Sequence, residues 1–167
     1  VTPHARVERM VTRLRDALGP VDILVNNAGV LLEKPLLETT EEDWDFVLQT
    51  DLKSVFLCSR AVLPSMVERG SGVVINIASE LGIVGRERYG PYCAAKAGVI
   101  GLTRAMAREF APAVRVNAIA PGPVNTPMLS LQNMSPQMLE RERAIPARRV
   151  GEPAEIAGTA VFLASGL

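Results

Sequence analysis

Hydrophobic and polar positions alternate along the chain with two different periods. Helical spacing over residues 2–18 predicts an amphipathic helix that Gly19 and Pro20 end. Three short apolar runs lack that spacing and are typical of buried strands, at residues 22–26, 73–78 and 113–118. The pattern therefore predicts a chain in which strands are separated by longer helical segments.

Helices are predicted between and after these strands. Thr39 or Thr40 is suited to cap a helix that continues to about Glu68, and Pro91 stands near the start of a helix that runs to about Phe110. Two more helical patterns follow, at residues 136–143 and 153–164. Such alternation predicts right-handed crossovers, so the expected fold class is α/β, with a three-layer, Rossmann-like, doubly wound parallel sheet.

The composition narrows the class of protein. The chain has 167 residues, a length that fits one domain over 1–167, and 48% of them are hydrophobic, which excludes a disordered chain. Lys and Arg number 18, and Asp and Glu also number 18. This balance gives no electrostatic reason to expect nucleic acid or an acidic membrane surface as a partner.

The sequence also gives no signal for secretion, membrane insertion or metal binding. The uncharged stretch at residues 116–139 is long enough to span a bilayer but is interrupted by four prolines, so a loop is expected there. The cysteines, Cys58 and Cys93, have no metal-ligand spacing and are expected to be buried thiols. We therefore expect a cytoplasmic protein with no metal site.

Ligands of open α/β sheets bind beyond the carboxyl ends of the strands. Asn-Asn-Ala-Gly at residues 26–29 follows the first predicted strand, Ser79 the second, and a proline-rich segment the third. The small residues of the first site would let a flat ligand approach the backbone, although an ordinary tight turn explains them equally well.

Tyr92 and Lys96 are four residues apart on a predicted helix and therefore share one face. A free phenol has a pKa of about 10, and a nearby ammonium favours its ionised form. Taken alone, the pair could be an ordinary contact on a helix surface.

The order of these features resembles the short-chain dehydrogenase/reductase family, in its core branch. The similarity covers essentially the whole chain and rests on NNAG, Ser79, YCAAK at residues 92–96, and Pro121-Gly122. It implies a Rossmann-like NAD(P)-binding domain that carries the catalytic half. The implied activity is oxidoreduction at CH–OH groups, interconverting a secondary alcohol and a ketone.

The resemblance also implies a role for each site residue. Tyr92 would be the general acid/base, Ser79 would orient the substrate oxygen, and Lys96 would bind the nicotinamide ribose and lower the Tyr92 pKa. NAD and NADP both remain open as cofactor. The residues implied to bind it are Asn26, Ala28, Gly29, Tyr92, Lys96, Pro121, Gly122, Val124 and Thr126.

Asp51 departs from the family pattern, in which an asparagine bends the helix and holds a water in a proton relay to the lysine. If the relay uses the backbone carbonyl, Asp51 can replace that residue as a fourth catalytic group. If the side-chain amide matters, a carboxylate near Lys96 would alter the relay. A third interpretation places Asp51 in contact with Lys53 or solvent.

The glycine-rich turn that holds the dinucleotide phosphates in the family has no counterpart here. The chain therefore resembles a piece cut at both ends, without the first strands and the last strand of the sheet. We expect these 167 residues to bind dinucleotide weakly or not at all and to be inactive as they stand. The alternative function is a catalytically silent relative, or a truncated product, that acts as a binding or scaffold subunit.

Partners are expected to be a small-molecule alcohol or ketone and further copies of the chain. Charged residues at 80–89 would favour a polar or anionic substrate, such as a sugar acid or a carrier-bound ketoacyl group, or are simply solvated. The resemblance implies a homodimer or homotetramer, formed through the helices near 51–68 and 91–110, the second of which is rich in small residues.

Overall fold

The computed structural model describes residues 4–166. It contains two compact units, which divide between Ala120 and Pro121 and are described separately below. The prediction of one domain over residues 1–167 stays a prediction.

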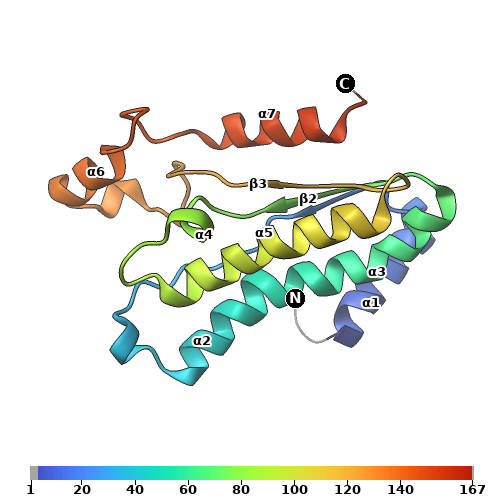
Figure 1. Ribbon diagram of the computed structural model, residues 1–167, viewed down its shortest axis with the longest axis horizontal. Coiled ribbons are helices and arrows are strands. Elements are labelled where there is room, and N and C mark those ends of the chain that lie inside the picture. Colours follow the sequence, from blue (N-terminus) through green and yellow to red (C-terminus); the bar gives the residue numbers. More distant parts are fainter. Residues whose placement is uncertain (1–3, 167) are drawn as a thin grey trace. The chain divides into compact units, whose positions relative to one another are not determined.

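The first unit contains a parallel sheet of three strands in the order β1 (Ile23–Asn26), β2 (Val73–Ile77) and β3 (Arg115–Ile119). In the register, Asn26 pairs with Asn76, and Asn76 pairs with Ala118. All carboxyl ends therefore meet at one edge of the sheet (Figure 1). The predicted α/β fold with parallel, Rossmann-like strand order is confirmed.

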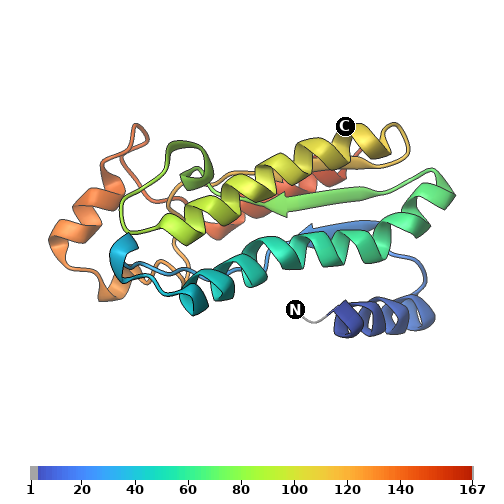
Figure 2. The same cartoon turned by 60° about the horizontal axis from the view of Figure 1, so that its bottom comes forward.

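Helices α1, α3 and α5 lie side by side along one face of this sheet (Figure 2). The helical elements of the first unit are α1 (His4–Leu18), η1 (Leu36–Glu38), α2 (Glu41–Leu48), η2 (Gln49–Lys53), α3 (Ser54–Arg69), α4 (Leu81–Val84) and α5 (Gly90–Phe110). This arrangement leaves the first turn of α5 and the short α4 at the carboxyl edge of the strands (Figure 1).

The main core lies between the helices and the sheet. It buries apolar side chains of α3, α5, β2, β3 and the residue before β3, namely Val62, Leu63, Met66, Val74, Met106, Val114 and Val116. On β1, Ile23 and Val25 face away from this core and are 48% and 46% exposed. Each Å² of apolar surface that is removed from water stabilises the fold by about 25 cal/mol. This burial is the main contribution that holds the helices on the sheet.

The helix predicted to run to Glu68 is interrupted in its middle. Thr40 caps its start, accepting from the Asp43 backbone while the Asp43 side chain accepts from the Thr40 backbone. The π-helical turn η2 then separates α2 from α3. Turns of this kind are rare and often occur at functional sites.

The second unit holds η3 (Leu131–Asn133), α6 (Pro136–Arg143) and α7 (Pro153–Ala164). An isolated parallel bridge joins Val124 to Gly151. No helix within residues 4–166 is both long and apolar enough to cross a membrane.

Candidate active site

The carboxyl edge of the sheet gathers the predicted site residues of the first unit. Asn26 ends β1, Ser79 follows β2, and Tyr92 and Lys96 lie on the first turns of α5. Ser79, Tyr92 and Lys96 are all buried. The fold therefore brings together residues that are widely separated in the sequence.

A buried polar network braces this edge from inside. The Asn26 amide donates to the Asn76 side chain (2.8 Å) and to Ser59 Oγ (3.2 Å). The Asn76 amide donates to Thr103 Oγ1 (2.9 Å), whose hydroxyl donates to the Val99 carbonyl (2.7 Å). Satisfied networks of this kind rigidify a core. Both amide donors of Asn26 are therefore used within the protein.

Lys96 is anchored by two groups in the interior. Its Nζ donates to the Ile77 carbonyl at 3.1 Å and lies 3.3 Å from Asp51 Oδ2. The same nitrogen lies 5.4 Å from the centroid of the Tyr92 ring. An ammonium has three N–H donors, so these contacts leave at least one for a hydroxyl of a bound molecule.

Asp51 lies in the middle of the π-helical turn and is buried. Its Oδ1 accepts from the Val30 backbone N–H at 2.8 Å. The interpretation that Asp51 contacts Lys53 or solvent is therefore wrong, since its carboxylate faces Lys96 in the interior. Burial raises the Asp51 pKa, and the Lys96 charge opposes that rise without cancelling it.

Gly29 lies directly against this ion pair. A Cβ at Gly29 would come within 3.1 Å of Asp51 Oδ2 and 3.4 Å of Lys96 Nζ. Among the described residues, Asp51 Oδ2 is a buried polar atom that accepts no hydrogen bond, so the ion pair is its polar contact. The small residue of the NNAG turn is thus explained by close packing on the charged pair.

Tyr92 is buried, and burial raises the pKa of its phenol to about 12. A hydrogen bond with Ser79 lowers this pKa, whereas the charges of Asp51, Glu80 and Cys93 raise it further. Burial outweighs the groups that favour the phenolate, and the expectation that Lys96 lowers the Tyr92 pKa stays a prediction. At neutral pH the phenol is protonated.

Ser79 Oγ accepts from the Leu81 backbone N–H at 3.2 Å, which fixes the side chain at the start of α4. The same hydroxyl donates to Glu80 at 3.2 Å. Gly82 of α4 packs so closely on α5 that a Cβ would lie 2.7 Å from the Ala97 nitrogen. This packing holds the Ser79 segment against the helix that carries Tyr92.

Tyr89 is the second tyrosine of this region and has a different environment. Its hydroxyl donates to Glu33 at 3.0 Å, and Glu33 also pairs with Arg88 at 3.1 Å. Arg86 lies over the Tyr89 ring at 5.2 Å. Tyr89 therefore joins the loop that follows β1 to the loop that precedes α5.

The remaining predicted cofactor residues lie in the second unit. These are Pro121, Gly122, Val124 and Thr126. Their segment is fixed within that unit, since Asn125 N donates to the Gly151 carbonyl (2.8 Å) and Gly151 N donates to the Pro123 carbonyl (2.9 Å). In the first unit, Ala28 is exposed and Gly29 half-buried.

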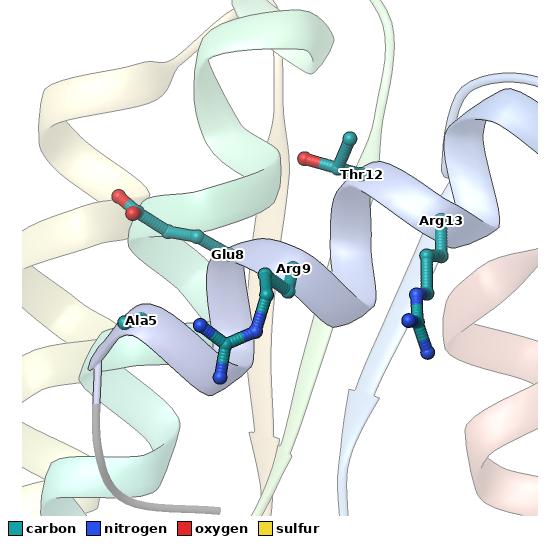
Figure 3. A pocket seen from close by; sticks show the side chains of 5 residues that line it. All are labelled: Ala5, Glu8, Arg9, Thr12 and Arg13. Atoms are coloured by element: carbon teal, nitrogen blue, oxygen red, sulfur yellow. The ribbon is translucent and has the colours of Figure 1, made fainter.

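A hollow on α1 is lined by residues of that helix, and none of the predicted site residues lines it (Figure 3). Its lining residues are Ala5, Glu8, Arg9, Thr12 and Arg13. Within the part of the chain described, no three His, Cys, Asp or Glu side chains are grouped to hold a metal ion.

Sequence reasoning missed several groups that hold the site. The Val30 N–H and the Ile77 carbonyl are backbone groups, which carry no residue-type signal. Ser59 and Thr103 could have been noticed as polar residues among apolar neighbours in their helices. Glu33 gives no signal at all, because its partners lie on a distant loop.

The chain is similar to known reductases over nearly its whole length. A family model described as enoyl-(acyl carrier protein) reductase matches residues 1–167. A 3-oxoacyl-(acyl-carrier-protein) reductase of Vibrio cholerae is 42% identical over 166 residues, which are 99% of this chain and 68% of that protein. Its counterpart in Staphylococcus epidermidis is 43% identical, over 95% of this chain and 65% of that protein. The chain thus spans about two thirds of these relatives.

Two further matches widen the range of relatives. Nodulation protein G of Azospirillum brasilense is 44% identical over 99% of this chain and 67% of that protein. Among solved structures, a protein assigned as a gluconate dehydrogenase from Agrobacterium tumefaciens matches with a TM-score of 0.92 and 39% identity. That match covers 96% of this chain and 64% of the other.

Proposed function

The chain belongs to the short-chain dehydrogenase/reductase family, and we propose that it interconverts a secondary alcohol and a ketone with NAD or NADP. The observation that carries this proposal is the burial of Ser79, Tyr92 and Lys96 together at the carboxyl edge of the sheet. Buried titratable groups that converge at such an edge are typical of active sites.

The donors at this edge suit a nicotinamide ribose. Lys96 has an N–H donor beyond its contacts with Ile77 and Asp51, and ribose hydroxyls are acceptors for such a donor. We propose that Lys96 and Tyr92 hold the ribose, with the backbone of Ala28 and Gly29 on the adenosine side. When bound, the nicotinamide supplies or accepts the hydride.

Tyr92 handles the proton in this proposal. In ketone reduction the phenol donates its proton to the substrate oxygen as that oxygen gains electron density, and in alcohol oxidation the phenolate takes the proton back. Ser79 orients the same oxygen with its one hydroxyl hydrogen, which turns from Glu80 to the substrate. Because the pKa of Tyr92 is about 12, the protein by itself holds the donor form at neutral pH.

We propose that the second unit binds part of the cofactor through the segment that contains Pro121, Gly122, Val124 and Thr126. Its hydrogen bonds to Gly151 keep backbone groups in a fixed arrangement, which suits recognition of a planar carboxamide. We propose that this segment, with the Thr126 hydroxyl, also holds the phosphate nearest the nicotinamide. Weak dinucleotide binding, or none, by these residues alone stays our expectation.

The substrate class is proposed from two sources. Relatives named for 3-oxoacyl-(acyl-carrier-protein) and for gluconate favour a carrier-bound ketoacyl group or a sugar acid. Arg88 is paired with Glu33 and Arg86 lies over Tyr89, so both arginines are held on the loop that precedes α5. We propose that their positive charges there favour a polar or anionic substrate.

Assembly and location are also proposals. We expect homodimers or homotetramers through α3 and α5, which light scattering of the full-length protein would detect. A cytoplasmic location stays a prediction.

An activity assay on the full-length protein tests the function. The assay offers NADH or NADPH with 3-oxoacyl thioesters, 3-keto sugar acids and neutral ketones, and follows nicotinamide absorbance. Turnover with at least one ketone is expected. Cofactor binding without turnover on any substrate would favour the binding or scaffold subunit instead.

A further inference from the structure

Asp51 is fixed on both oxygens by groups from two other parts of the fold. The Val30 N–H, just after the NNAG turn, donates to Oδ1 at 2.8 Å. Lys96 Nζ lies 3.3 Å from Oδ2 and donates to the Ile77 carbonyl at the end of β2. The π-helical turn therefore places this carboxylate between the loop that follows β1 and Lys96 of α5.

The contact between Asp51 and Lys96 is direct. A separation of 3.3 Å leaves no room for a molecule between the two charged atoms. Gly29 encloses the pair from the side, since even a Cβ there would contact both partners. The side chains are 0% and 5% exposed, so solvent screens their charges little.

This direct pair changes the charge that Tyr92 experiences. The titratable groups that face Tyr92 are Asp51 from η2, Glu80 after β2, and Cys93 and Lys96 from its own helix. Without Asp51, an ammonium 5.4 Å from the ring would favour the phenolate. With Asp51 in contact, the negative charge of its carboxylate largely cancels the effect of the Lys96 ammonium on Tyr92.

We propose that Asp51 is a positioning residue that fixes the Lys96 ammonium through a direct ion pair and thereby biases Tyr92 toward the role of proton donor. The proposal rests on the proposed function, because it concerns how that same site holds its proton. It assigns to Asp51 a role that acts through Lys96 and requires no contact with substrate.

The sign of the expected effect follows from the charges. Replacing Asp51 by Asn removes a negative charge near Tyr92 and keeps an oxygen for the Val30 N–H. The phenolate is then favoured, and the Tyr92 pKa falls. Alcohol oxidation needs the phenolate, so its rate in D51N should reach a plateau at lower pH, by about one pH unit or more. Ketone reduction needs the phenol and should decline at correspondingly lower pH.

The experiment records rate against pH in both directions for full-length wild type and D51N. Asp45→Asn is the matched control, because Asp45 is an exposed acid on α2 that precedes the π-helical turn. A shift of both profiles to lower pH in D51N, with none in D45N, is the expected result. Superposable wild-type and D51N profiles would overturn the proposal. So would loss of all turnover in folded D51N, because a residue that only biases Tyr92 is not indispensable.

A second measurement keeps the test decisive if D51N does not fold or if no substrate is found. Ring-carbon NMR of tyrosine-labelled, cofactor-free wild type gives the Tyr92 titration midpoint directly. The same titration is made on a second variant, Asp51→Ser: a lower midpoint in D51S than in wild type supports the proposal, and equal midpoints overturn it. Absence of turnover in wild type would count against the proposed function alone.

Discussion

Two carboxylates of this chain are each paired with a basic side chain, and their pKa values move in opposite directions. Glu155, in the second unit, receives two bonds from Arg149 at 2.6 and 2.7 Å, and its pKa falls to about 2. Asp51 lies 3.3 Å from Lys96, yet its pKa is raised. An ion pair by itself therefore does not decide the protonation of its acid.

Burial explains the difference. The Glu155 and Arg149 side chains are 46% and 59% exposed, so water still solvates the carboxylate while the guanidinium and the Glu152 N–H favour its charged form. Asp51 has lost that water, and desolvation outweighs the lysine. The exposed pair joins the segment before α7 to its first turn, whereas the buried pair sets the electrostatics beside Tyr92.

The largest effect should come from breaking the buried pair. Lys96→Met leaves Asp51 buried without its partner, and removing one member of such a pair costs about 3–5 kcal/mol in the free energy of unfolding. Denaturant unfolding of the full-length protein measures this loss. It should shrink as the pH falls, because protonation of Asp51 removes the unpaired charge.

Lys34→Met is the control for that comparison. Lys34 pairs with Asp43 at 2.6 Å, but the side chains are 33% and 27% exposed, so a loss of about 0–1 kcal/mol is expected. Equal losses in the two variants would contradict the distinction between buried and exposed pairs.

A smaller effect is expected from crowding the buried pair without changing its charge. Gly29→Ala would place a methyl 3.1 Å from Asp51 Oδ2. Overpacking of this kind costs about 1–3 kcal/mol, which chemical denaturation would show. Gly158→Ala, where an added Cβ meets nothing within 4 Å, is the matched control. A tolerated G29A variant would show that the pair is loosely held.

The smallest effect concerns the exposed pair and depends on pH. The folded-state pKa of Glu155 is below its ordinary 4.5, so its contribution to stability is present above pH 4.5 and is lost as the pH falls toward about 2. Glu155→Gln should therefore lie below wild type in thermal midpoint at neutral pH and converge with it in acid. A constant difference across that range would contradict the assignment.

Much of the fold follows from hydrophobic period and cap residues. The three strands and the longer helices were predicted within a few residues, because each buries a face with its own period. The π-helical turn η2 and the four-residue α4 were not predicted. Both are short, and tertiary packing around Asp51 and Gly82 explains them better than local propensity does.

The candidate site was predictable in its residues but not in its electrostatics. Ser79, Tyr92 and Lys96 are marked by strand ends and by helical spacing. Asp51 was ambiguous, because its partner lies on another helix, 45 residues away in the sequence. The raised Tyr92 pKa depends on burial and on that partner, neither of which the spacing of Tyr92 and Lys96 reveals.

The measurement that tests the account most directly is the turnover of full-length Tyr92→Phe beside Tyr89→Phe. Tyr92→Phe removes the proposed proton donor, so kcat should fall by about 100- to 10,000-fold while cofactor affinity is retained. Tyr89→Phe removes only the hydroxyl that binds Glu33 and should keep most of its kcat. A Tyr92→Phe enzyme as active as wild type, or a Tyr89→Phe enzyme that loses as much, would contradict the assignment of Tyr92.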